Sequence, residues 1–154
     1  MSLKISHKEI SVVGGAGHVG FPLGLVFSSK GFKVSLIDKD KTSIKKINKG
    51  QIPFLEENSK KLLGSMIKKK RIHATSQLNE VRRSKYIIVC IGTPITRKLN
   101  PSLKNFFNFF RQLNKLLKKG AQIDGVIACP HHPLAKGKYK HKNHPCRKPN
   151  GGMF

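Results

Sequence analysis

Six residues near the amino terminus have the glycine spacing of a phosphate-binding turn. They are Gly15, Ala16, Gly17, His18, Val19 and Gly20. This G-x-G-x-x-G sequence follows an apolar run over 9–13 and precedes apolar residues at helical spacing over 19–29, which is the context that such a turn requires. Gly15 permits the tight turn, Gly17 lets the backbone approach a pyrophosphate, and Gly20 permits close packing of the helix on the sheet. Free N–H groups and the helix dipole would then favour the phosphates.

An acidic residue in the right place adds a second part to this site. Asp38 lies 18 residues beyond the last glycine and directly after the expected strand 33–37. A carboxylate there accepts hydrogen bonds from the hydroxyls of an adenosine ribose. A 2′-phosphate would meet the same carboxylate, so the pattern favours NAD over NADP. The alternative interpretation is a structural glycine turn followed by a surface aspartate.

Strands and helices alternate through the first 120 residues. Apolar runs predict strands over 9–13, 33–37, 72–74 and 86–91, and helical spacing predicts helices over 19–29, 42–48, 56–70 and 101–117. This alternation predicts an α/β fold with a Rossmann-like doubly wound parallel sheet over residues 1–120. The composition then changes, and residues 121–154 read as an irregular tail with one further short strand over 123–128.

The tail carries four residues that can bind a metal ion. Cys129 and His131 form a C-x-H pair, and His144 and Cys146 form an H-x-C pair. Two thiolates and two imidazoles suit tetrahedral zinc and disfavour magnesium or calcium. The spacing differs from that of a DNA-reading zinc finger. A disordered basic tail with scattered histidines and cysteines is the alternative.

The charge is strongly basic, with 31 Lys and Arg against 7 Asp and Glu and a net charge of +24. Such a balance normally suggests nucleic acid or an anionic surface. The basic residues are spread along the chain without the interleaved aromatics of a base-stacking surface, so we favour biased codon usage and keep a nucleic-acid-binding module as an alternative. We find no apolar stretch of membrane-spanning length and no signal peptide, and the three cysteines form no disulfide framework, so we expect a cytoplasmic protein without a membrane partner.

Three stretches in colinear order resemble the UDP-glucose/GDP-mannose dehydrogenase family. Residues 12–25 are similar to its opening, residues 47–56 to its N-x-G-x-x-P-x-x-E stretch, and residues 87–94 to its fourth-strand signature. The resemblance covers nearly all of 1–120 and implies an NAD-binding Rossmann domain. It also implies that Thr93 lies against the cofactor, the alternative being a threonine that caps the turn before Pro94.

The family's later segments have no counterpart in this sequence. Its Pro-Gly turn, its catalytic-cysteine motif and its substrate domain are not found, and Cys90, Cys129 and Cys146 lie in other contexts. We therefore expect no sugar oxidation by this chain alone, and a separate chain carrying the substrate domain is the partner that the resemblance implies.

Residues 124–154 resemble the zinc loop of the D-glycero-D-manno-heptose bisphosphate phosphatases. His144 stands where that family has its third ligand cysteine, and Arg147 and Lys148 correspond to its phosphate-contacting residues. A zinc-binding relative of these phosphatases is thus an alternative function, although the D-x-D nucleophile is not found and phosphatase activity is not expected. Both families act in making surface-polysaccharide sugars. The expected division is an NAD-binding domain over 1–120 and a zinc-loop fragment over 121–154.

Overall fold

The computed structural model describes residues 6–54, 59–92, 103–117, 137–141 and 144–145. The chain forms two compact units, residues 1–92 and residues 93–154. Among the described residues, no helix is both long and apolar enough to cross a membrane.

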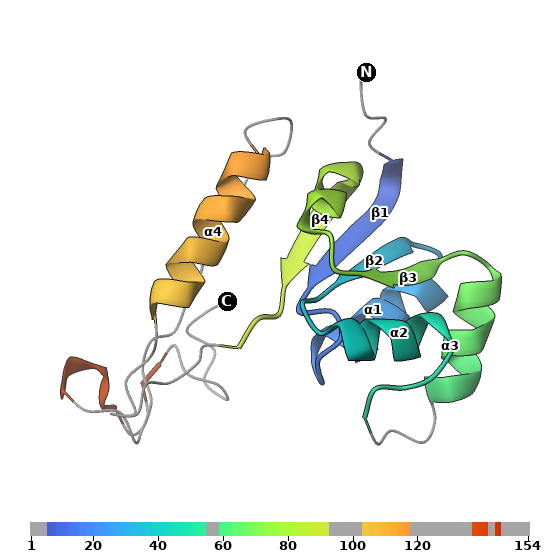
Figure 1. The fold of residues 1–154 in the computed structure, drawn as a ribbon, viewed down its shortest axis with the longest axis horizontal. Helices are drawn as coiled ribbons and strands as arrows, with labels where there is room; N and C mark the ends of the chain where they lie inside the picture. Colours follow the sequence, from blue (N-terminus) through green and yellow to red (C-terminus); the bar gives the residue numbers. More distant parts are fainter. Residues whose placement is uncertain (1–5, 55–58, 93–102, 118–136, 142–143, 146–154) are drawn as a thin grey trace. The chain divides into compact units, whose positions relative to one another are not determined.

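A parallel four-stranded sheet forms the centre of the first unit (Figure 1). Its strands are β1 (Ser6–Val13), β2 (Lys33–Ile37), β3 (Ile72–Thr75) and β4 (Ser84–Val89), in the order β3-β2-β1-β4. The helices between them are α1 (Gly20–Ser29), α2 (Lys41–Asn48), α3 (Ser59–Lys68) and the 3₁₀ helix η1 (Leu78–Arg83). All strand pairs are parallel, so the predicted α/β Rossmann-like sheet is confirmed. From β1 the chain adds β2 and β3 on one side and then β4 on the other, so the order of the strands switches between β1 and β4. Ligands of such folds bind at this switch point.

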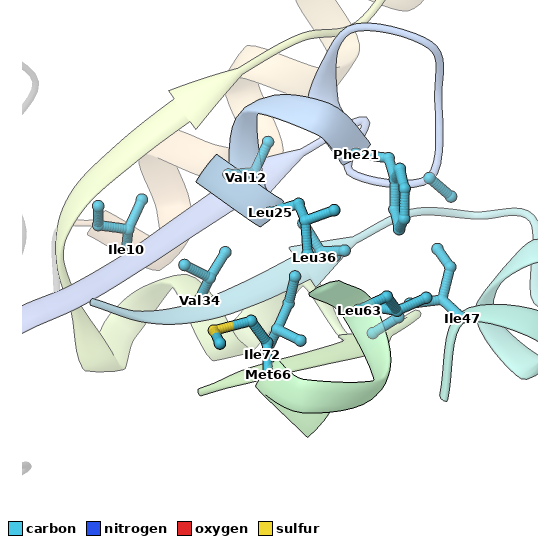
Figure 2. Close-up of a cluster of buried hydrophobic side chains, with 12 residues drawn as sticks. Ile10, Val12, Phe21, Leu25, Val34, Leu36, Ile47, Leu63, Met66 and Ile72 are labelled. Carbon is cyan, nitrogen blue, oxygen red and sulfur yellow. The ribbon is translucent and has the colours of Figure 1, made fainter. Parts of the chain in front are cut away.

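One hydrophobic core joins the sheet to the helices (Figure 2). Val12, Val34 and Leu36 are buried on one face of the sheet, because alternate residues of a strand point to the same side. Phe21 of α1 and Leu63 of α3 are also fully buried in this cluster. Burying a side chain of this size contributes about 1.5–3 kcal/mol, so this cluster supplies most of the drive to assemble the unit.

The three α-helices of this unit end with the same capping turn. The residue after each C-cap has a left-handed backbone, with φ of +100° at Gly31, +74° at Gly50 and +52° at Lys70. In α3, the Arg71 amide donates to the Met66 carbonyl at 2.9 Å, which closes a Schellman motif. Glycine adopts this conformation without strain, whereas the side chain of Lys70 makes it costly.

The predicted elements differ from the observed ones mainly at their ends. The strand expected over 86–91 spans Ser84–Val89, because β4 pairs with β1 from Ser84 onward and β1 ends at Val13. The Cys90 amide makes the last bond, to the Val13 carbonyl at 2.7 Å. Cys90 therefore follows the strand in which it was expected, and it packs half-buried against the core.

Other differences concern elements that apolar periodicity does not mark. The 3₁₀ helix η1 was not predicted, although its Val81 is fully buried. The helix expected over 56–70 is described as α3 from Ser59, and residues 55–58 lie outside the described part. The remaining strands and helices of the unit lie within a few residues of their expected bounds.

The second unit contains α4 (Leu103–Leu117) and the short 3₁₀ helix η2 (Gly137–Tyr139). Leu113 and Leu117 lie one helical turn apart and are both buried. The rings of Phe109 and Phe110 meet edge to face with centroids 5.3 Å apart. The expected start of this helix at 101 and the expected strand over 123–128 fall outside the described residues.

Candidate functional site

The glycine turn joins β1 to α1 at the carboxyl edge of the sheet. The amides of Gly14 and Gly15 both donate to the Ile37 carbonyl, at 2.8 and 3.1 Å, so the turn is fixed to the end of β2. Within it, the Gly17 amide donates to the Gly14 carbonyl at 3.2 Å and the Phe21 amide to the Gly17 carbonyl at 3.0 Å. All four of these bonds join backbone atoms.

The close packing of this turn explains its glycines. Gly14 has a φ of +77°, and a Cβ there would lie 2.5 Å from the Cys90 carbonyl oxygen. A Cβ on Gly15 would lie 2.7 Å from the Leu36 Cα, and one on Gly20 would collide with the Gly14 carbonyl oxygen. The left-handed residue of the turn is thus Gly14, to which the sequence interpretation gave no role, whereas Gly15 permits the approach to β2.

The glycine that brings α1 against the sheet also differs from expectation. A Cβ on Gly24 would collide with Leu36 Cδ2 and would lie 3.3 Å from Val34 Cγ1, whereas Gly20 packs against the turn. Both missed glycines had a sequence signal. Gly14 directly precedes the motif, and Gly24 follows Gly20 at helical spacing on the same helix.

The space beside the turn suits an anion. Among the described residues, a Cβ on Gly17 would meet only the Gly14 carbonyl oxygen, at 3.5 Å, so no described group covers the outer side of this residue. Val19, the N-cap of α1, is 68% exposed, no side chain caps this helix end, and its first turn has no acidic residue. The positive end of the helix dipole at this uncapped start favours a phosphate group, so this part of the site fits the pyrophosphate of a dinucleotide.

Asp38 lies against the same turn. Its Oδ2 accepts a hydrogen bond from the Ala16 amide at 3.0 Å, and its Oδ1 accepts one from the Asp40 amide at 3.1 Å. The Asp38 amide in turn donates to the Thr75 carbonyl at the end of β3, at 3.0 Å. A carboxylate has about four acceptor positions, so each oxygen of Asp38 retains capacity for a ligand hydroxyl.

An aromatic stack covers one side of the turn. The exposed ring of His18 lies on the ring of Phe54, with centroids 4.3 Å apart and an angle of 22° between the planes. Phe54 also meets the buried Phe21 edge to face at 5.6 Å. The segment after α2 is thereby attached to the glycine turn. The sequence interpretation gave Phe54 no role, although it lies within the family-like stretch 47–56.

Asn48 supports the neighbouring edge of the sheet. Its Nδ2 donates to the Ala74 carbonyl and its Oδ1 accepts from the Ala74 amide, both at 2.8 Å. The Asn48 side chain thus makes the two backbone hydrogen bonds at Ala74 that a neighbouring strand would make at this edge of the sheet. The next residue of β3 is Thr75, whose carbonyl accepts the hydrogen bond from the Asp38 amide. This role gives a physical reason for the asparagine that begins the N-x-G-x-x-P stretch.

Several predicted site residues lie outside the described part of the chain. Thr93, Cys129, His131 and Cys146 are among them, so their grouping remains a prediction. His144 is described, and its ring meets that of His141 edge to face with centroids 4.8 Å apart. Within the described residues, no three histidine, cysteine or acidic side chains are grouped as metal ligands.

Comparison with known proteins identifies the first part of the chain. Residues 8–128 match the UDP-glucose/GDP-mannose dehydrogenase family, NAD binding domain. The UDP-glucose 6-dehydrogenase of Rhizobium meliloti is 36% identical over 84 residues, which are 54% of this chain and 19% of that protein. The UDP-N-acetyl-D-mannosamine dehydrogenase of Pyrococcus horikoshii is 26% identical over 109 residues, which are 71% of this chain and 26% of that protein.

Solved structures agree on the fold. The ternary complex of GDP-mannose dehydrogenase from Pseudomonas aeruginosa superposes with a TM-score of 0.67 at 24% identity, over 73% of this chain and 26% of that one. The chain spans about a quarter or less of the length of these relatives. Together with the glycine turn, Asp38 and the parallel sheet, these matches show that the chain belongs to the UDP-glucose/GDP-mannose dehydrogenase family and contains its NAD-binding domain.

Proposed function

We propose that this chain binds NAD through the turn from Gly14 to Gly20 and through Asp38. The pyrophosphate lies against Gly17 and the uncapped start of α1, and the adenosine ribose lies against the Asp38 carboxylate. The observation that carries this assignment is the hydrogen bond from the Ala16 amide to Asp38 Oδ2, at 3.0 Å. It brings the ribose acceptor next to the phosphate-binding backbone, as a single dinucleotide requires.

The charge at this position favours NAD over NADP. A phosphate on the ribose 2′-oxygen would face the Asp38 carboxylate, and two negative charges at contact distance repel each other. We also propose Thr93 as a cofactor contact, because it follows the end of β4 closely in the sequence and β4 lies beside the turn.

Calorimetric titration with NAD tests the assignment. Asp38→Ala should weaken NAD binding by about 1–3 kcal/mol, the cost of leaving ligand hydroxyls without an acceptor. Asp40→Ala is the matched control, because the Asp40 carboxylate bonds to Thr42 and Ser43 and not to the turn. Equal weakening in both variants, or no change in Asp38→Ala, would exclude Asp38 as the ribose acceptor.

We further propose that this NAD-binding domain serves the oxidation of a nucleotide sugar, together with a substrate domain on a separate chain. The purified 154-residue chain should form no NADH from UDP-glucose or GDP-mannose. Adding a polypeptide that carries the family's substrate domain and catalytic cysteine should restore NADH formation. Turnover by the chain alone would contradict this division of the enzyme.

A zinc site in the tail is a second proposal. It is supported by the ligand types of the four residues, two thiols and two imidazoles, which suit tetrahedral zinc. Binding through Cys129, His131, His144 and Cys146 should give about one zinc per chain in elemental analysis.

Two variants test this site. Cys146→Ser should lose the zinc and His132→Ala should keep it. His141→Ala is a less clean control, because the His141 ring packs on His144. Equal zinc content in Cys146→Ser and the parent, or none in the parent, would exclude the site.

A further inference from the structure

Asn48 is linked to Asp38 by a continuous series of bonds. Its side-chain amide donates to the Ala74 carbonyl and accepts from the Ala74 amide, both at 2.8 Å. The next residue of β3 is Thr75, and its carbonyl accepts a hydrogen bond from the Asp38 amide at 3.0 Å. A side chain at the end of α2 is thus connected, through two residues of β3, to the backbone of the candidate ribose acceptor.

The end of β3 depends on the Asn48 side chain. This strand has four residues and lies at the edge of the described sheet. Ala74 is buried, and a buried backbone N–H or C=O without a partner is unfavourable. In the described part of the chain, Asn48 supplies the partners of both groups. It therefore stabilises β3 at the point where this strand reaches Asp38.

Asp38 lies one residue beyond the paired part of β2. The last register pair between β2 and β3 is Ile37 with Thr75. The Ile37 carbonyl is occupied by amides of the glycine turn, and the Thr75 carbonyl holds the Asp38 main chain itself. The amides of Ala16 and Asp40 then hold the two carboxylate oxygens. The place of this carboxylate therefore depends on the end of β3.

The fold holds Asn48 in position for this contact. Asn48 is the last residue of α2, and the neighbouring Ile47 is fully buried in the core (Figure 2). The helix ends in a turn in which the amide of the left-handed Gly50 donates to the Ile47 carbonyl at 2.9 Å. An asparagine amide presents one donor and one acceptor side by side, which matches the C=O and N–H of a single strand residue.

We propose that Asn48 is a positioning residue for the NAD-binding carboxylate of Asp38, an inference that rests on the proposed NAD site. Through Ala74 and Thr75 it holds the Asp38 main chain, and with it the place of the carboxylate beside the glycine turn. This carboxylate accepts the ribose hydroxyls of NAD and repels the 2′-phosphate of NADP. The preference for NAD over NADP therefore depends on Asn48, which acts at β3.

Calorimetric titration of the full chain with NAD and with NADP measures this dependence as the ratio of the two dissociation constants. The parent should bind NAD at least about tenfold more tightly than NADP, the effect of one nearby like charge. Asn48→Ala should reduce this preference by roughly three- to tenfold, within the range of coupling between residues of one hydrogen-bond network. A smaller folded fraction weakens the apparent binding of both cofactors equally, so the ratio separates positioning from a merely structural role.

Three further variants accompany this measurement. Asp38→Ala gives the ratio without the carboxylate, and adding Asn48→Ala to it should change the ratio no further. Asp40→Ala is the matched control, because it removes the cap at the other end of α2 and should keep the parent's ratio. Asn48→Asp keeps the acceptor for the Ala74 amide and loses the donor to its carbonyl. It should give an intermediate ratio, and it replaces Asn48→Ala if that variant does not fold.

The outcomes distinguish this inference from the proposed function. If the parent binds neither cofactor or both equally, or if Asp38→Ala keeps the parent's ratio, the proposed NAD site fails and the inference fails with it. If Asp38→Ala lowers the ratio but the folded Asn48 variants keep it, the NAD site stands and Asn48 has only a structural role. The same conclusion follows if Asp40→Ala lowers the ratio as much as Asn48→Ala.

Discussion

Replacing Gly20 by alanine tests how the turn and α1 fit together. The added methyl group would collide with the Gly14 carbonyl oxygen and lie 2.9 Å from the Gly14 carbonyl carbon and 3.0 Å from the Gly15 Cα. All three atoms belong to the backbone, so no side chain can rotate away. Gly14 cannot retreat either, because its amide is bonded to the Ile37 carbonyl and the Cys90 carbonyl occupies its other side.

The size of the effect follows from two opposing contributions. Forcing an extra methyl into a packed position costs about 1–3 kcal/mol. Alanine in a helix is more favourable than glycine by about 0.5–1 kcal/mol, which offsets part of this cost. We expect a net loss of about 1–2 kcal/mol in the free energy of unfolding. For a unit of this size, each kcal/mol corresponds to about 4–8 °C in Tm, so the midpoint should fall clearly.

Thermal unfolding followed by circular dichroism measures this loss, with two alanine variants as references. Gly64 lies in α3, and a Cβ there would meet none of the described residues within 4 Å, so Gly64→Ala should raise the free energy of unfolding. Gly17→Ala should leave the fold nearly unchanged, because the Gly14 carbonyl oxygen, at 3.5 Å, is the only described atom that its Cβ would meet. The same variant should weaken NAD binding. If Gly20→Ala were as stable as Gly64→Ala, the packing described for the turn would be wrong.

Three further changes test other parts of the first unit. Lys70→Gly should raise the free energy of unfolding by about 0.5–1 kcal/mol, measured by denaturant unfolding, because glycine adopts the left-handed conformation without strain. Asn48→Ala should lower it by about 1–2 kcal/mol in the same assay, through the loss of two hydrogen bonds to Ala74. Hydrogen bonds from the Ser43 hydroxyl and amide hold the pKa of Asp40 below its usual value. Asp40 is the N-cap of α2. Its ionised carboxylate therefore stabilises the fold above the ordinary aspartate pKa of about 3.9, and this stabilisation is lost as the pH falls through the lowered pKa, so the acid dependence of Tm should be smaller in Asp40→Ala.

Apolar patterning predicted the elements whose burial is regular. Strand β2 has its expected bounds, because a charged residue precedes its apolar run and Asp38 ends it. The 3₁₀ helix η1 was missed because a single residue, Val81, anchors it, and one apolar residue has no period. The end of β4 depends on where β1 stops, which is a property of the partner strand and cannot be read from residues 84–91 alone.

The residues of the candidate site also divide into those that have a local sequence signal and those whose role depends on tertiary contacts. The motif and Asp38 could be predicted because each has a local sequence signal and the fold brings strand ends to one edge. The role of Gly14 could not, because it depends on the Cys90 carbonyl, which lies directly after β4 and is distant in sequence. Asn48 and Phe54 act through tertiary contacts with β3 and with His18, and neither residue type is unusual in a surface segment.

The two amides that bond to Asp38 have a consequence for the thermodynamics of recognition. A free surface carboxylate loses rotational freedom when a ligand fixes it, at a cost of about 0.5–1.5 kcal/mol for an immobilised side chain. Asp38 has already lost that freedom on folding, since the Ala16 and Asp40 amides hold one oxygen each. A hydroxyl-bearing ligand therefore meets an acceptor that is aligned before it arrives. The fraction of its interaction energy that appears as affinity is correspondingly larger.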